Sequence, residues 1–126
     1  MLLCEDHPLN KQIAEKLLSK EGVITDWARN GQEAVERFDT SAEDFYAAIL
    51  MDIRMPVMDG LEAARRIRKL SRPDAKSVPI LAMSANAFAE DVKASLAAGM
   101  NAHLPKPIDP QALYQALAEQ IGKEKC

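Results

Sequence analysis

Acidic, hydroxyl and cationic side chains follow four short apolar runs of this 126-residue chain, each close to the point where the run ends. Glu5 and Asp6 follow the first run, Asp52 follows a second, and Ser84 and Lys106 follow two later ones. If these ends lie together, carboxylate oxygens can bind a hard divalent cation. A carboxylate can then attack phosphorus while an ammonium group stabilises the charge on the transferring oxygens. The residue types therefore indicate metal-assisted phosphoryl transfer, with no separate general base because a carboxylate is already ionised at neutral pH.

Strands and helices must alternate along the chain to position these residues. Runs typical of strands buried on both faces recur at Met1–Cys4, Val23–Ala28, Tyr46–Met51, Val78–Met83 and Ala102–Leu104. Between them, apolar residues recur at helical spacing, and Asp59 and Asp109 are expected to cap two of the helices. This alternation predicts one α/β domain over residues 1–126, a doubly wound (βα)5 unit whose five-stranded parallel sheet carries helices on both faces.

Composition and charge exclude several function classes. Lys and Arg number 16 against 19 Asp and Glu, for a formal net charge of −3, and there is no long basic run. Direct contact with nucleic acid or an anionic membrane surface is therefore not expected. No apolar stretch reaches the length of a membrane span, and Glu5 and Asp6 interrupt the apolar start that a secretory signal would need. The two cysteines, Cys4 and Cys126, lack metal-ligand spacing, so we expect a cytoplasmic location.

Open α/β sheets bind ligands beyond the carboxyl ends of their strands. In the strand order 2-1-3-4-5, which one common class of these sheets adopts, the first and third strands are neighbours about 4.8 Å apart. Asp6 and Asp52 would then reach one cation, and Mg²⁺ suits the site because it needs only one or two carboxylates and leaves positions for phosphate oxygens. Lys106 would lie roughly 10 Å from Asp52, a gap that its flexible side chain can largely cross. Ser84 could donate a hydrogen bond to the same phosphate.

Four segments together resemble the response-regulator receiver domains of two-component systems. They are Leu2–Asp6, Met51–Gly60, Ala82–Ala87 and Leu104–Pro107. The resemblance covers essentially the whole chain and implies a flavodoxin-like fold with the strand order 2-1-3-4-5. It also implies that Asp52 accepts a phosphoryl group from the phosphohistidine of a histidine kinase or a histidine-phosphotransfer domain. Such a domain takes part in catalysis without being a turnover enzyme for a diffusible substrate.

The same matching implies a metal site and a switch. Mg²⁺ would be held by Asp6, Asp52 and the backbone carbonyl of Arg54, with Glu5 acting through water. Ser84 would be the hydroxyl that moves onto the phosphate.

The remaining matches concern the charge partner of the phosphate and the residues around it. Lys106 would be that charge partner. Three residues before it, where many receivers carry a switching Tyr or Phe, this chain has His103, which is either a switch or a half-exposed strand residue. Arg54 and Asn86, each two residues after a site residue, would flank the attacking water and set the phosphate lifetime.

The segment from Gly99 to Asp109 resembles receivers attached to hybrid sensor kinases, and the first strand starts beside Met1. We therefore expect an excised receiver of a hybrid histidine kinase, whose parent protein could be anchored in a membrane. A stand-alone single-domain regulator remains the alternative. A phosphohydrolase of the haloacid-dehalogenase type is disfavoured because Arg54 stands where a second acid is needed. A flavodoxin-like cofactor carrier is disfavoured because the acidic residues after the first strand would repel a phosphate.

Overall fold

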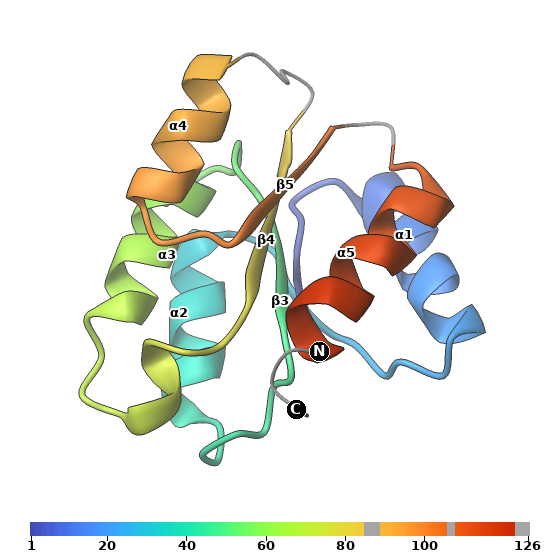
Figure 1. Ribbon diagram of the computed structural model, residues 1–126. Helices are drawn as coiled ribbons and strands as arrows, with labels where there is room; N and C mark the ends of the chain where they lie inside the picture. Colours follow the sequence, from blue (N-terminus) through green and yellow to red (C-terminus); the bar gives the residue numbers. More distant parts are fainter. Residues whose placement is uncertain (85–88, 106–107, 123–126) are drawn as a thin grey trace.

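Strands and helices alternate along the chain as the apolar runs predict (Figure 1). The computed structural model describes residues 1–84, 89–105 and 108–122. The elements are β1 (Leu2–Cys4), α1 (Pro8–Lys20), β2 (Asp26–Ala28), α2 (Gly31–Thr40), β3 (Ile49–Asp52), α3 (Gly60–Arg68), the 3-10 turn η1 (Pro73–Ala75), β4 (Ile80–Ser84), α4 (Ala89–Ala97), β5 (Ala102–Pro105) and α5 (Pro110–Gly122). No helix in the described part of the chain is both long and apolar enough to cross a bilayer.

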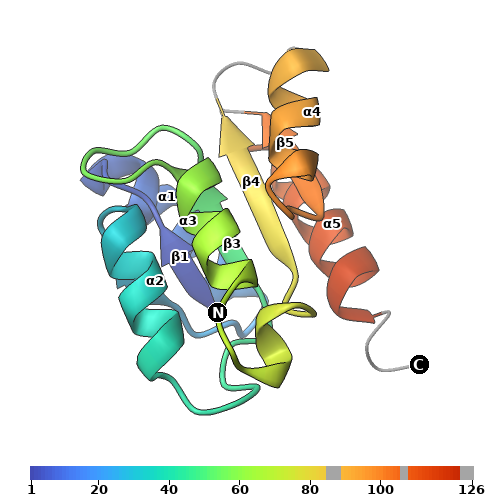
Figure 2. The same cartoon turned by 90° about the vertical axis from the view of Figure 1, so that its left-hand side faces the viewer.

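The five strands form one parallel sheet in the order β2-β1-β3-β4-β5, which confirms the expected topology. Helices α1 and α5 cover one face, and α2, α3 and α4 cover the other (Figures 1 and 2). In the register, Cys4 lies opposite both Ala28 and Met51, so β1 ends level with β2 and one residue before β3, which ends at Asp52. The carboxyl ends of the strands therefore meet at one edge of the sheet, which we call the carboxyl edge.

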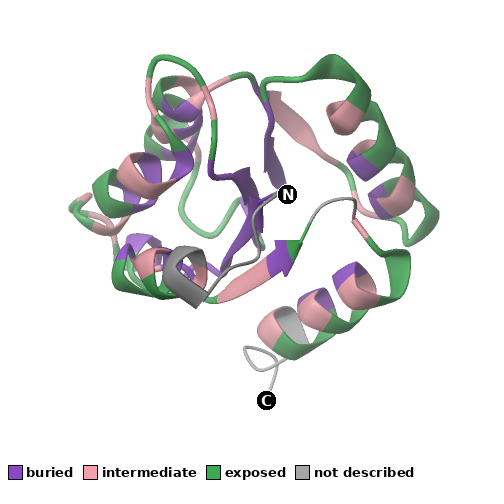
Figure 3. Ribbon diagram, turned by 90° about the horizontal axis from the view of Figure 1, so that it is seen from above, coloured by how far each residue is buried: buried purple, intermediate pink, exposed green. Residues whose placement is uncertain are grey.

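Alternate residues of the central strands pack into two separate cores, one on each face of the sheet. Leu2 and Cys4 belong to the core beneath α2 and α3, whereas Leu3 belongs to the core beneath α1 and α5. All residues of β1, β3 and β4 are buried, while the edge strands β2 and β5 are only partly covered (Figure 3). Burial of both faces explains why the central strands are continuous apolar runs instead of alternating ones.

Side-chain caps begin three of the helices. Asn30 accepts a hydrogen bond of 2.8 Å from the backbone of Glu33 in α2, and Asp59 accepts one of 2.8 Å from Glu62 in α3. Asp109 accepts one of 3.1 Å from the backbone of Ala112 in α5. The caps expected at Asp59 and Asp109 are therefore confirmed, and α3 starts directly beyond the loop that follows β3.

Strands β2 and β3 each begin three residues later than the apolar runs predict. The run from Val23 was expected to begin β2, but the amide of Val23 donates to the carbonyl of Leu18 and so closes the end of α1. The run from Tyr46 was expected to begin β3. Tyr46 is buried and donates from its hydroxyl to a carboxylate oxygen of Asp26 at 2.9 Å, outside the ladder of the sheet. Val23 and Tyr46 pack against the core without pairing in the sheet. An apolar run does not distinguish such residues from paired strand residues.

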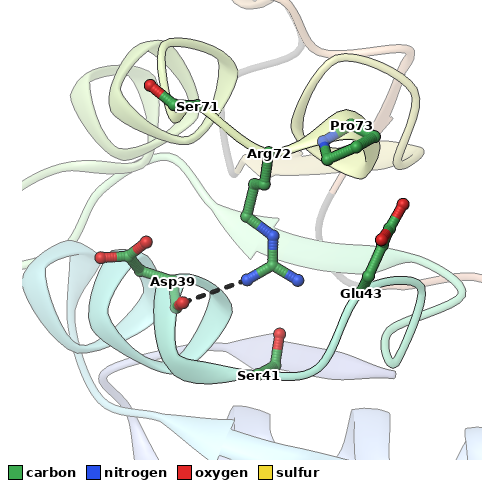
Figure 4. Close-up of a pocket in the computed structure, with 6 residues that line it drawn as sticks. All are labelled: Asp39, Ser41, Glu43, Ser71, Arg72 and Pro73. Atoms are coloured by element: carbon green, nitrogen blue, oxygen red, sulfur yellow. Dashed lines mark hydrogen bonds between the residues drawn. The ribbon is translucent and has the colours of Figure 1, made fainter.

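Arg72 links two segments at the end of the molecule opposite the carboxyl edge. Its guanidinium group donates to the carboxylate of Asp74 at 2.7 and 3.0 Å, and to the backbone carbonyls of Phe38 and Ala42. It also donates to the backbone carbonyl of Asp39 at 3.1 Å (Figure 4). It also lies 4.5 Å from the centre of the Phe38 ring. This cluster fastens the connection between α3 and β4 to the end of α2, away from the carboxyl edge.

Candidate functional site

Three carboxylates meet at the carboxyl edge of the sheet. Glu5 and Asp6 directly follow β1, Asp52 is the last residue of β3, and these two strands are neighbours. One carboxylate oxygen from each residue lies within 4.8 Å of the others. Glu5 and Asp52 are buried, with 1% and 5% of their surface exposed, whereas Asp6 is exposed to solvent. The structure thus brings together the three acids that the sequence singled out.

Hydrogen bonds fix the backbone and the carboxylate of Glu5. Its amide donates to the carbonyl of Ala28 at 3.0 Å, and its carbonyl accepts from the indole N–H of Trp27 at 2.7 Å. Its carboxylate accepts from the amide of His7 at 3.1 Å. Glu5 is therefore held through its backbone N–H, its backbone carbonyl and its side chain.

The loop that follows β3 holds Asp52. The amide of Arg54 donates to Oδ1 of Asp52 at 3.2 Å, while most of the Arg54 side chain faces solvent. Farther along, the amide of Met58 donates to the carbonyl of Pro56 at 2.7 Å across Val57, whose φ is +68°. This hydrogen bond closes a three-residue γ-turn, a conformation that a β-branched residue rarely adopts.

The remaining predicted site residues differ in where they lie. Ser84 ends β4, is buried, and follows Met83, the residue opposite Asp52 in the register, so it reaches the same edge. His103 lies opposite Ala82 in β5, two residues short of that edge. It is half-buried, and its Nε2 atom is buried with no hydrogen-bond partner in the part of the chain that the structure describes. Lys106 and Asn86 fall outside the described residues.

The donor set fits a hard divalent cation. All the candidate ligand atoms are carboxylate oxygens, which Mg²⁺ and Ca²⁺ prefer. Two direct ligands of one Mg²⁺ lie at most about 4.2 Å apart, since each bond is about 2.1 Å long. A spread of up to 4.8 Å therefore suits two direct ligands and a third that acts through a water molecule. A cation here would also balance three negative charges that otherwise repel one another.

Cys4 lies beside the acids but does not belong to this donor set. It is fully buried, and burial raises the pKa of its thiol far above the usual range. A thiol that stays protonated is neither a nucleophile nor a good metal ligand. Cys4 therefore acts as a small apolar residue of the core.

Trp27 is the residue near the site that the sequence did not indicate. It lies 22 positions from Glu5 along the chain, in the middle of β2, and a half-buried tryptophan in a strand is ordinary core material. The hydrogen bond to the carbonyl of Glu5 depends on how far the indole ring reaches along the edge of the sheet. No local pattern of residue types predicts such a contact.

Sequence comparisons identify the family. The response regulator receiver domain model matches residues 1–118. Hybrid signal transduction histidine kinase I of Dictyostelium discoideum is 34% identical over 125 residues, which are 98% of this chain and 7% of that protein. The peroxide stress-activated histidine kinase mak1 of Schizosaccharomyces pombe is 39% identical over 114 residues, 90% of this chain and 7% of that protein. The chain thus spans only a small part of the length of these relatives.

Solved structures agree with this identification. The receiver domain of the sensor histidine kinase PA1611 from Pseudomonas aeruginosa, with a magnesium ion coordinated in its active-site cleft, is 39% identical with a TM-score of 0.85, covering 96% of this chain and 95% of that one. The co-crystal structure of the Saccharomyces cerevisiae phosphotransfer protein Ypd1 and the receiver domain of Ssk1 matches at 30% identity and a TM-score of 0.85, covering 98% and 88%. The expected fold is confirmed, and the chain belongs to the family of response regulator receiver domains.

Proposed function

We propose that this receiver domain accepts a phosphoryl group onto Asp52 from a phosphohistidine, in a reaction that depends on Mg²⁺. The observation that carries the proposal is the meeting of Glu5, Asp6 and Asp52 within 4.8 Å at the carboxyl edge of the sheet. The magnesium ion in the related Pseudomonas aeruginosa receiver supports the choice of metal.

A carboxylate oxygen of Asp52 attacks the phosphorus atom, the P–N bond to the donor histidine breaks, and Asp52 becomes an acyl phosphate. Asp6 and Asp52 would hold Mg²⁺ together with the carbonyl of Arg54, with Glu5 acting through water. Bound Mg²⁺ supplies charge stabilisation to the oxygens of the transferring group. The hydroxyl of Ser84, at the end of the next strand, would donate to the phosphate, and Lys106 would be its charge partner. Either water or a second histidine then removes the phosphoryl group.

Exposed apolar side chains near the acids support a protein as the phosphoryl donor. Leu9 and Ile13 lie one helical turn apart in the first half of α1, directly after the acidic end of β1, and are 59% and 47% exposed. Val57, in the loop after Asp52, is 83% exposed. A histidine-phosphotransfer domain or the kinase itself would cover these residues while its phosphohistidine reaches Asp52. The related receiver crystallised with Ypd1 is consistent with such a partner.

We further propose that the domain functions within a hybrid histidine kinase in the cytoplasm. The Dictyostelium discoideum relative is a hybrid signal transduction histidine kinase, and the Schizosaccharomyces pombe relative is a histidine kinase. His103 would then contribute to the switch from its position in β5. A stand-alone single-domain regulator is the alternative. The formal charge of −3 supports a role without direct binding to nucleic acid or membrane.

Phosphorylation of the purified domain tests the acceptor. We expect an acid-stable, base-labile phosphate adduct by intact mass after incubation with acetyl phosphate and Mg²⁺, and no adduct in the presence of a chelator. Asp52→Asn should abolish it. Asp59→Asn is the matched control, since it changes an acid in the same loop while asparagine still caps α3. An undiminished adduct in Asp52→Asn would refute the assignment.

A second experiment tests whether the phosphoryl donor docks on Leu9 and Ile13. The double variant Leu9→Ala with Ile13→Ala should slow phosphoryl transfer from a phosphorylated histidine-phosphotransfer protein about tenfold or more. It should leave phosphorylation by acetyl phosphate unchanged. Ile24→Ala removes a side chain that is 85% exposed beside the N-terminus, at the opposite end of the sheet, and should change neither rate. Equal slowing with both donors would contradict a docking role.

A further inference from the structure

Trp27 joins the edge strand β2 to the acidic end of β1. Its indole Nε1–H donates to the backbone carbonyl of Glu5 at 2.7 Å. We propose that Trp27 is a positioning residue for the metal site, because this hydrogen bond fixes the peptide that links Glu5 to Asp6. The proposal rests on the magnesium site proposed above. It adds a residue that touches neither the metal nor the phosphate and acts through Glu5.

The position of the Glu5–Asp6 peptide decides where both carboxylates point. The amide of Glu5 is bound to the carbonyl of Ala28, which continues the pairing of β1 with β2 by one residue. The carbonyl of Glu5 cannot be bound in the same way, because β2 ends at Ala28 and the chain turns into α2 at Gly31. The indole N–H takes the place of the missing backbone donor. Without it, a carbonyl next to a buried carboxylate would lose this hydrogen bond, and the peptide could rotate more freely.

Neighbouring cations hold the indole ring independently of its N–H group. Lys11 Nζ lies 4.9 Å and the Arg29 guanidinium carbon lies 5.0 Å from the centre of the ring. Lys11 is itself fixed by an ion pair of 2.8 Å with Glu15, one turn farther along α1. A phenylalanine at position 27 would keep an aromatic face for both cations while losing the donor. The substitution Trp27→Phe therefore separates the hydrogen bond from the packing.

The hydroxyl of Tyr46 provides a matched comparison. It also donates a hydrogen bond onto β2, to the carboxylate of Asp26 at 2.9 Å. Asp26 lies at the other end of that short strand, opposite Leu2 in the register, and does not contact Glu5 in any described hydrogen bond. Tyr46→Phe thus removes a side-chain hydrogen bond to the same strand without touching the proposed route to the metal.

Titration with MgCl₂, followed by NMR of ¹⁵N-labelled protein, tests the proposal. The backbone amides of His7 and Arg54 report on Glu5 and Asp52, to whose carboxylates they donate. We expect Trp27→Phe to raise the Kd for Mg²⁺ about tenfold, the scale seen when partners of metal ligands are removed. Tyr46→Phe should leave the Kd unchanged. In the wild-type protein, the single indole N–H resonance should shift with the same Kd as the two amides, since the chain has one tryptophan.

Asp6→Asn separates failure of this proposal from failure of the metal site. If Asp6→Asn weakens Mg²⁺ binding but Trp27→Phe binds as the wild type does, the positioning role is wrong and the site stands. If Asp6→Asn binds Mg²⁺ normally, the proposed ligand set is wrong. Equal weakening by Trp27→Phe and Tyr46→Phe would also overturn the proposal, because it would reveal a general loss of order in β2. Thermal unfolding of each variant shows that the titrated protein is folded.

Discussion

Gly60 lies directly against the backbone carbonyl of Asp52. A Cβ atom on Gly60 would come within 2.2 Å of that carbonyl oxygen and 2.9 Å of the Ile53 Cα atom. The amide of Gly60 also donates to the carbonyl of Ile53 at 2.7 Å. Glycine is required here by this close approach and not by a positive φ, which the structure places at Gly22 and Gly99 instead. The first turn of α3 thus sets the backbone position of the proposed phosphoacceptor.

Gly60→Ala should therefore disturb both stability and the site. Because backbone atoms cannot yield as a flexible side chain can, we expect a loss of about 1–3 kcal/mol in the free energy of unfolding. Displacement of Asp52 should also weaken Mg²⁺ binding. The control is Gly22→Ala, where φ is +75° but nothing lies within 4 Å of the added atom. It should cost about 1 kcal/mol and leave Mg²⁺ affinity unchanged. Wild-type Mg²⁺ affinity in a folded Gly60→Ala protein would contradict this prediction.

Val57→Gly should stabilise the domain. Val57 adopts φ +68° in the γ-turn after Asp52 and its side chain is 83% exposed, so its removal relieves strain without opening the core. We expect a gain of about 1 kcal/mol by urea unfolding, since left-handed backbone costs an L-residue roughly that much. Val57→Ala keeps a Cβ atom and should gain much less. The prediction fails if the two variants are equally stable.

The pairing of Arg72 with Asp74 makes the free energy of unfolding depend on pH in the acidic range. Hydrogen bonds from Arg72 hold the pKa of the buried Asp74 carboxyl below its usual range. A depressed pKa means that the unfolded chain binds a proton more readily. The stabilisation is therefore full above the unfolded pKa of about 3.9 and is lost as the pH falls through the lower pKa of the folded state.

Asp74→Asn should remove this contribution and leave Arg72 without its charge partner. We expect about 3 kcal/mol of destabilisation at neutral pH. The free energy of unfolding should also fall less steeply as the pH is lowered into the acidic range. Asp39→Asn is the control, because Asp39 accepts the hydrogen bond of Arg72 through its backbone carbonyl at 3.1 Å, which the substitution keeps. A change below about 0.5 kcal/mol is expected there. An equally steep fall for the wild type and Asp74→Asn would refute the pairing as the cause.

A substitution at Arg54 should change the lifetime of the phosphate on Asp52 without changing the affinity for Mg²⁺. Its amide is fixed on Asp52, but its side chain is exposed, so Arg54→Ala should leave the backbone in position. We expect several-fold faster loss of phosphate from Asp52, because a smaller side chain gives water freer access, with an unchanged Mg²⁺ affinity. The decay of radiolabelled adduct measures the rate. Arg65→Ala, on the exposed face of α3, should match the wild type. An Arg54→Ala decay rate equal to that of the wild type would refute the role.

The sequence by itself determined the parts of this domain that depend on short-range pattern. Apolar runs separated by segments of helical spacing indicate the order of strands and helices. A strand buried on both faces needs a continuous apolar run, whereas a helix buried on one face needs apolar residues at helical spacing. The acids and Ser84 could be assigned to the carboxyl edge because parallel strands all end on one side. Asp59 and Asp109 could be identified as caps because capping acts within three residues.

Only the tertiary structure decided the contacts between segments that are distant in the sequence. The indole of Trp27 meets Glu5 because β2 ends one residue too early to pair with it, and this depends on the register between two strands. Gly60 must be glycine because α3 starts against β3, and Arg72 donates to backbone carbonyls at the end of α2 from a loop more than 30 residues away. These relationships follow from how the elements cross and where each one stops. The crossing of two elements and the residue at which each ends leave no periodic pattern in the sequence, because the packing of whole elements determines them.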